Sequence, residues 1–116
     1  METFALKYRD TLPILEVVLL NPDKTVHDLT GTSSYKLHIR LRDGGTITRS
    51  MTLYGLATAG TLRYQWLATD WTDAVTPLVA GQHRMEYEVL GPGAARLTWP
   101  NDGYDELRIV SDVGQG

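Results

Sequence analysis

Residues 34–54 carry the sequence SYKLHIRLRDGGTITRSMTLY, in which apolar and polar side chains alternate on both sides of a glycine pair. Alternation with a period of two is typical of a β-strand that has one buried and one solvated face. The stretch therefore predicts two antiparallel strands joined by a tight turn at Asp43-Gly44-Gly45. The apolar phase of the first strand is Tyr35, Leu37, Ile39 and Leu41.

The turn also predicts how the two strands pair. A loop made of the two glycines alone would set apolar residues of one strand opposite polar residues of the other, on the same face. A three-residue loop with one glycine in the left-handed conformation pairs Leu41 with Ile47 instead. That register places Arg49 on the inner face opposite Ile39, so we expect this end of the strand to lie near a sheet edge.

The same alternation continues along most of the chain. Short strands that recur every eight to twelve residues or so, with turns between them, predict an all-β antiparallel sandwich of about seven strands. The longest connection is residues 70–82, and a single helical turn fits Asp70 to Ala74 within it. The expected strands are 12–20, 34–42, 46–54, 61–68, 83–90, 94–99 and 104–111.

A single domain accounts for the chain. Its 116 residues are 42% hydrophobic, which is enough for one core but too little chain for two domains of ordinary size. We expect residues 12–112 to form the sandwich. Residues 1–11 are expected to be an N-terminal arm, and residues 113–116 a flexible tail.

The composition excludes several classes of function. Without cysteine, the chain has no disulfide, no thiolate nucleophile and no cysteine-ligated zinc. A net charge of −3 argues against general binding of nucleic acid. The longest apolar stretch, residues 14–20, contains Glu16 and is too short to cross a bilayer. We therefore expect no nucleic-acid partner, no membrane anchor and no cofactor.

Catalytic and metal-binding patterns are missing as well. The three histidines fall on different expected elements and lack the spacing of a local chelate. Asp70 and Asp73 are candidates for an acid and base pair in glycoside hydrolysis, although turn formation explains them more simply. A calcium site at the acidic turn 101–106 stays open, because oxygen ligands gather around a glycine there, but the spacing does not match an EF-hand loop and a solvated turn is the simpler explanation. These observations predict a protein that is not an enzyme. The histidines are His27, His38 and His83.

Aromatic side chains offer a binding alternative. The face of a Trp or Tyr ring can stack on a sugar ring, and such a ring must be exposed. Trp71, in the long connection, and Tyr104, beside the acidic turn, are the candidates for sugar stacking. The aromatic residues on inward phases are expected to fill the core. These are Tyr64, Trp66, Tyr87 and Trp99.

Residues 12–20 are apolar in both strand phases. A strand of this kind is either buried on both sides or covers a partner. Because each sheet of a small sandwich has one solvated face, we expect this strand to contact a partner, and Pro13 indicates an edge position. The phase expected to face the core is Leu15, Val17 and Leu19. The phase expected to contact the partner is Ile14, Val18 and Leu20.

Four short motifs are spread along the chain. Asp28-Leu29-Thr30-Gly31 precedes the strand at 34–42, and Tyr64-Gln65-Trp66 precedes the acidic loop at Asp70. Gly81 opens the strand that contains Met85-Glu86-Tyr87-Glu88-Val89, and Leu97-Thr98-Trp99-Pro100-Asn101-Asp102-Gly103-Tyr104 joins the last two strands. Together the motifs resemble the immunoglobulin-like N-terminal domain of phage baseplate upper proteins.

The resemblance implies both a fold and a role. The implied fold is an immunoglobulin-like β-sandwich. The implied role is a non-enzymatic bacteriophage virion structural protein, made in the host cytoplasm and present in multiple copies beside other virion proteins. It would act as an assembly, attachment or decoration module of the tail, baseplate or capsid exterior. The family's motif positions are structural, so no site residue is carried over. The alternative is a carbohydrate-binding or host-adhesion module.

Overall fold

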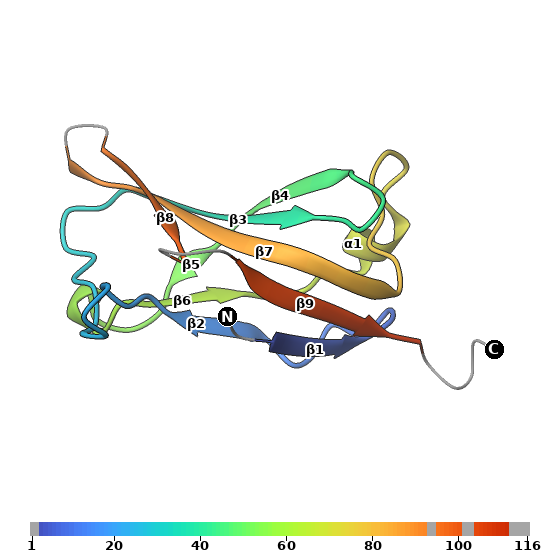
Figure 1. Cartoon of the computed structure of the whole chain (residues 1–116), viewed down its shortest axis with the longest axis horizontal. Coiled ribbons are helices and arrows are strands. Elements are labelled where there is room, and N and C mark those ends of the chain that lie inside the picture. Colours follow the sequence, from blue (N-terminus) through green and yellow to red (C-terminus); the bar gives the residue numbers. More distant parts are fainter. Residues whose placement is uncertain (1–2, 93–94, 101–103, 112–116) are drawn as a thin grey trace.

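The computed structural model describes residues 3–92, 95–100 and 104–111, which form two β-sheets packed face to face (Figure 1). The nine strands are β1 (Thr3–Lys7), β2 (Leu15–Val18), β3 (Ser34–Arg40), β4 (Thr46–Ser50), β5 (Thr52–Leu53), β6 (Thr61–Tyr64), β7 (Gly81–Leu90), β8 (Arg96–Trp99) and β9 (Asp105–Val110). Two short helices accompany them, a 3-10 helix at Ala57–Ala59 and α1 at Ala68–Thr72. The expected all-β sandwich is confirmed.

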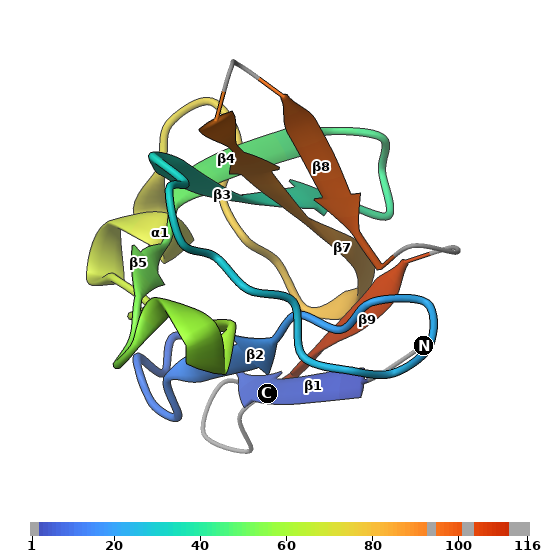
Figure 2. The same cartoon turned by 90° about the vertical axis from the view of Figure 1, so that its left-hand side faces the viewer.

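The order of the strands follows the immunoglobulin arrangement. The large sheet has the order β1-β9-β7-β3-β4, with β8 also paired to β7, and the small sheet has the order β2-β6-β5. In the small sheet, β2, β6 and β5 take the places of immunoglobulin strands B, E and D. In the large sheet, β3, β7 and β9 take those of C, F and G. Figure 2 shows the two layers end-on, with α1 closing the side between β4 and β5.

The strands depart from the sequence-based expectation in two places. Thr3–Lys7, expected within an arm at 1–11, form β1, which pairs with β9 in parallel and buries Leu6. The expected strand 46–54 is divided at the buried Met51, so that β4 lies in the large sheet and β5 in the small one. These changes account for nine strands instead of about seven. The tail expected at 113–116 lies outside the described residues.

The turn between β3 and β4 has the predicted type but a shifted register. Gly44 adopts the left-handed conformation with φ of 99°, and the N–H of Leu41 donates to the Gly45 carbonyl at 2.7 Å. Ile47 therefore lies opposite Ile39 instead of Leu41. The offset is two residues, and because it is even, Leu41, Ile39 and Ile47 are still buried on one face.

The core lies between the sheets and is built from the inward phases of both. Leu37 and Ile39 of β3 and Leu62 of β6 are fully buried at its centre. The aromatic side chains expected in the core are all buried, which confirms that expectation. They are Tyr64, Trp66, Tyr87 and Trp99.

Candidate binding surfaces

Asp70, a candidate catalytic carboxylate, joins the two sheets. Arg49, on the inner face of the edge strand β4 as predicted, donates from Nε to Asp70 Oδ1 at 2.8 Å. The Tyr64 hydroxyl of β6 and the Leu67 N–H donate to Oδ2 at 2.7 and 2.9 Å. Burial, with the hydrogen bond to Asp70, raises the pKa of Tyr64. Both oxygens of this buried carboxylate therefore accept hydrogen bonds that hold the fold together.

Asp73 has a local role in the connection after α1. Its Oδ1 accepts hydrogen bonds from the N–H groups of Val75 and Thr76 at 2.8 and 2.9 Å. Both bonds lower the pKa of the Asp73 carboxyl, and the bond from Thr76 has the larger effect. The expectation of a turn-forming aspartate thus agrees with the geometry.

The three histidines lie apart from one another. His83 is buried, accepts at Nδ1 from the Arg42 N–H at 3.1 Å, and donates from Nε2 to the Val79 carbonyl at 2.8 Å. One neutral tautomer satisfies both bonds and leaves neither nitrogen for a substrate. His27 bonds to Asn21, and His38 lies on β3. Within the part of the chain that the structure describes, no three potential metal ligands cluster.

The acidic turn at 101–106 is described in part, since residues 101–103 lie outside the described ranges. Asp105 is buried and accepts a hydrogen bond from the Tyr87 hydroxyl at 3.0 Å. Glu106 accepts one from the Thr3 hydroxyl at 3.2 Å. As neighbours on β9, Asp105 and Glu106 point to opposite faces of the sheet, so these two carboxylates do not converge on one ion.

The two candidates for sugar stacking differ in their exposure to solvent. Trp71 is only 5% exposed, packs edge-on against Tyr8 and donates from Nε1 to the Asp10 carbonyl at 3.2 Å. The expectation that it is exposed is therefore wrong, because the long connection folds back onto the core. Tyr104 is half-buried on the outer face of the large sheet, with the guanidinium of Arg84 4.5 Å from its ring centroid.

An apolar patch covers part of the outer face of the small sheet. Val18 and Leu20 are 44% and 40% exposed, and Leu20 pairs with Val26, which is also 44% exposed. We call Val18, Leu20 and Val26 the apolar patch. Ile14 is half-buried and is separated from the patch by the ion pair of Glu16. Val26 has no sequence signal of its own, since it is an isolated valine among turn residues and only pairing brings it to Leu20.

The strand that contributes Val18 to the patch is an edge strand. β2 is the last strand of the small sheet and pairs only with β6 among the described strands. An open groove of about 750 Å³ follows β2, and its walls include Phe4, Val17 and Trp99. Leu15 and Leu19 are buried in the core, whereas Val18 and Leu20 on the other phase are exposed, so this segment is not buried on both sides. The backbone edge of β2 that pairs with no described strand therefore lies next to the exposed side chains of the apolar patch.

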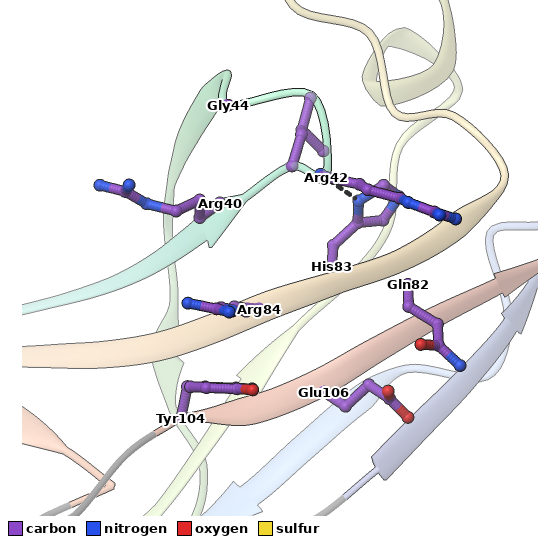
Figure 3. Close-up of a pocket in the computed structure, with 9 residues that line it drawn as sticks. Arg40, Arg42, Gly44, Gln82, His83, Arg84, Tyr104 and Glu106 are labelled. Atoms are coloured by element: carbon purple, nitrogen blue, oxygen red, sulfur yellow. Dashed lines mark hydrogen bonds between the residues drawn. The ribbon is translucent and has the colours of Figure 1, made fainter.

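A second, more polar pocket of about 550 Å³ opens on the outer face of the large sheet (Figure 3). Arg40 of β3 lies directly opposite Arg84 of β7, and Arg42 follows on the same phase of the chain. We call these three side chains the arginine pocket. In Figure 3, Arg40 and Arg84 extend in one direction and Arg42 extends away from them past His83.

The other half of this outer face is occupied by ion pairs. His38 Nε2 lies 2.6 Å from Glu88 Oε1, and Arg96 Nε lies 3.2 Å from Glu88 Oε2. His38 Nδ1 also bonds to the Thr48 hydroxyl at 3.0 Å, which ties β4 to β3 and β7. Glu88 thus neutralises its cationic neighbours, in contrast to the arginine pocket.

We expect part of the stability to be lost in acid through Glu88. The hydrogen bond from His38, assisted by the charges of Arg96 and Lys36, lowers the pKa of its carboxyl from the usual 4.5. A lowered pKa stabilises the fold above the unfolded value, and the contribution is lost as pH falls through the folded-state pKa. Between about pH 7 and about pH 3, the free energy of unfolding measured with urea should fall less for Glu88→Gln than for the parent, and the difference should be under about 1 kcal/mol.

The matched control is Glu86→Gln. Glu86 is exposed two residues away on the same strand and forms no ion pair with another described residue. Its variant should keep the acid dependence of the parent chain. An equal fall for Glu88→Gln and the parent would contradict the role of Glu88.

Comparison of the chain with protein-family models, with curated proteins and with solved structures found no match. Neither helix in the described ranges is long and apolar enough to cross a membrane. The function proposed below therefore rests on the geometry of the surfaces and on the motifs of the sequence.

Proposed function

We propose that this chain is a non-enzymatic bacteriophage virion structural protein that docks on other virion proteins or on copies of itself. It acts as an assembly, attachment or decoration module. The observation that carries the proposal is the apolar patch, which begins at the end of the edge strand β2 and continues to Leu20 and Val26. The resemblance of the sequence motifs to phage baseplate domains supplies the class of partner. The commitment of Asp70, Asp73 and His83 to structural hydrogen bonds supports a binding role over a catalytic one.

Two kinds of contact can act together at β2. Burying the remaining surface of a valine or leucine contributes part of the roughly 1.5–3 kcal/mol that full burial of such a side chain is worth. A strand added to the open edge of β2 would contribute backbone hydrogen bonds. Each contact is modest, but repeated copies in a symmetric particle multiply weak contacts through effective concentration.

The test is incorporation into particles. Val18→Asp combined with Leu20→Asp places two charges on the apolar patch, so we expect the variant to fold but to be lost from particles purified after expression during infection. Electron microscopy of labelled particles locates the parent chain, and quantitative blotting compares the variant with it. We expect at least about a tenfold fall in incorporation, since each uncompensated buried charge costs more than 1.4 kcal/mol or so.

Val75→Asp is the matched control. Val75 is 89% exposed in the connection after α1, away from β2, so its variant should be incorporated like the parent. Circular dichroism establishes that the charged variants are folded. Finding the parent chain only as a free monomer in the cytoplasm, with none in particles, would overturn the proposal.

A carbohydrate-binding or host-adhesion role is the second candidate. It is favoured by Tyr104, which lines the same cavity as the polar side chains Gln82 and Glu106. Trp71 no longer supports it, because its ring is buried. Binding to a glycan array that disappears in Tyr104→Ala would favour this role, and an absence of binding across diverse glycans would count against it.

A further inference from the structure

The outer face of the large sheet concentrates positive charge in a protein whose net charge is −3. Arg40 and Arg84 are directly opposed across β3 and β7, and Arg42 follows two residues after Arg40. On the next strand, Arg108 of β9 lies opposite Gln82, which lines the same pocket as Arg42. Arg40, Arg84 and Arg108 thus lie on three neighbouring strands, and Arg42 follows the end of β3.

The arginines of this pocket have no carboxylate partner among the described residues. Arg49, Arg63 and Arg96 each form an ion pair, whereas Arg40, Arg42 and Arg84 form none within residues 3–92, 95–100 and 104–111. The guanidinium of Arg84 lies 4.5 Å from the ring centroid of Tyr104. Like charges directly opposite one another across a sheet are destabilising, so this arrangement favours an anion that lies between them.

Glu106 does not act as the anion between these arginines. It lies opposite Arg84 in the β7–β9 register, yet its carboxylate accepts a hydrogen bond from the Thr3 hydroxyl and forms no ion pair with a described residue. The positive charge of the pocket is therefore available to a ligand.

The spread of the guanidinium groups indicates the shape of that ligand. Arg40 and Arg84 extend one way and Arg42 another, so the three do not converge on a point as donors around a single phosphate do (Figure 3). Neighbouring strands are about 4.8 Å apart, and alternate residues of one strand about 6.6 Å. An arginine fork matches a carboxylate, and an extended chain with carboxylates on alternate residues offers them one by one along its length, which suits guanidinium groups that do not converge.

We propose that the arginine pocket binds an extended acidic segment of a partner protein, with carboxylates on alternate residues. Arg40 and Arg84 hold one carboxylate, and Arg42 holds the next one. Tyr104 packs against Arg84 and restricts its movement before binding. This surface is separate from the apolar patch, since it lies on the opposite sheet, and the proposal does not depend on the virion role.

The test uses the full chain and two synthetic peptides. One peptide alternates glutamate and serine over eight or so residues, about the length of a strand, and the other has glutamine in place of each glutamate. We expect saturable binding of the acidic peptide in a nuclear magnetic resonance titration, with shifts in the arginine Nε–H signals. Arg84→Gln and Arg40→Gln should each weaken binding about tenfold, and added salt should weaken it too.

Arg96→Gln is the control for loss of one positive charge. Arg96 lies on the same face but is paired with Glu88, so its variant should bind the acidic peptide like the parent. Equal weakening in Arg96→Gln and Arg84→Gln would overturn the site. So would binding of the glutamine peptide, or binding of inorganic phosphate or of an oligothymidine as tight as that of the acidic peptide.

Discussion

Replacing Asp70 with alanine should lower the free energy of unfolding by about 3–5 kcal/mol, because it removes one partner of a buried ion pair. The side chain of Asp70 is 2% exposed, and its loss leaves the Nε–H of Arg49, the hydroxyl of Tyr64 and the N–H of Leu67 without this acceptor. The contact also joins β4 of one sheet to β6 of the other through α1. Urea unfolding, followed by tryptophan fluorescence and circular dichroism, measures the loss.

Two further variants isolate the interaction. Asp70→Asn keeps an oxygen that can accept from the Tyr64 hydroxyl but removes the charge facing Arg49, so its loss should be smaller than that of Asp70→Ala. Asp73→Asn changes a carboxylate that lies 3.8 Å from the Arg49 Nη2, and it should have the smallest effect of the three. A loss below about 1 kcal/mol for Asp70→Ala would place the pair among surface ion pairs and contradict this account.

Replacing Trp66 with alanine should also cost about 3–5 kcal/mol, the usual loss for a large aromatic residue removed from a core. Trp66 is 1% exposed and packs edge-on against Tyr64, with 5.1 Å between the ring centroids, and its ring is tilted against that of Phe4 at 6.1 Å. A cavity at this position would affect the small sheet and β1 together. Denaturant unfolding at equilibrium gives the change in stability.

Trp66→Phe is the informative companion. The indole Nε1 of Trp66 is buried and has no hydrogen-bond partner among the described residues, so phenylalanine removes an N–H that contributes no bond. The loss should therefore be distinctly smaller than that of Trp66→Ala. Leu56→Ala, at a side chain 76% exposed, should change stability by no more than about 0.5 kcal/mol. Equal losses for the phenylalanine and alanine variants would show that the indole N–H matters more than the packing of the ring.

Alternation predicts the sandwich well because it reports the two faces of a strand. Leu37, Ile39 and Ile47 are buried as their phase requires, and Arg49 lies on the inner face of an edge strand. The same argument misses β1, whose alternation covers only five residues, Thr3–Lys7. A segment so short becomes a strand because β9 is there to pair with it.

The candidate surfaces were predicted in part. Val18 and Leu20 are exposed on one face as expected, but Val26 joins them only through a pairing between Leu20 and Val26. The arginine pocket has no linear signal, because Arg40 and Arg84 are far apart in the chain and meet through the β3–β7 register. The burial of Trp71 has no local signal either, because it depends on packing against Tyr8, which is distant in the sequence.

The sequence alone therefore determines which side chains share a face, where the chain turns and which chemistries the absence of cysteine excludes. These are local properties, set by the period of the strand and by the conformational freedom of residues such as Gly44. Tertiary structure alone decides which strands become neighbours, and so brings Arg40 to Arg84, Val26 to Leu20 and Asp70 to Arg49. The physical reason is that pairing between distant strands depends on the packing of both sheets at once, which no single stretch of the chain encodes.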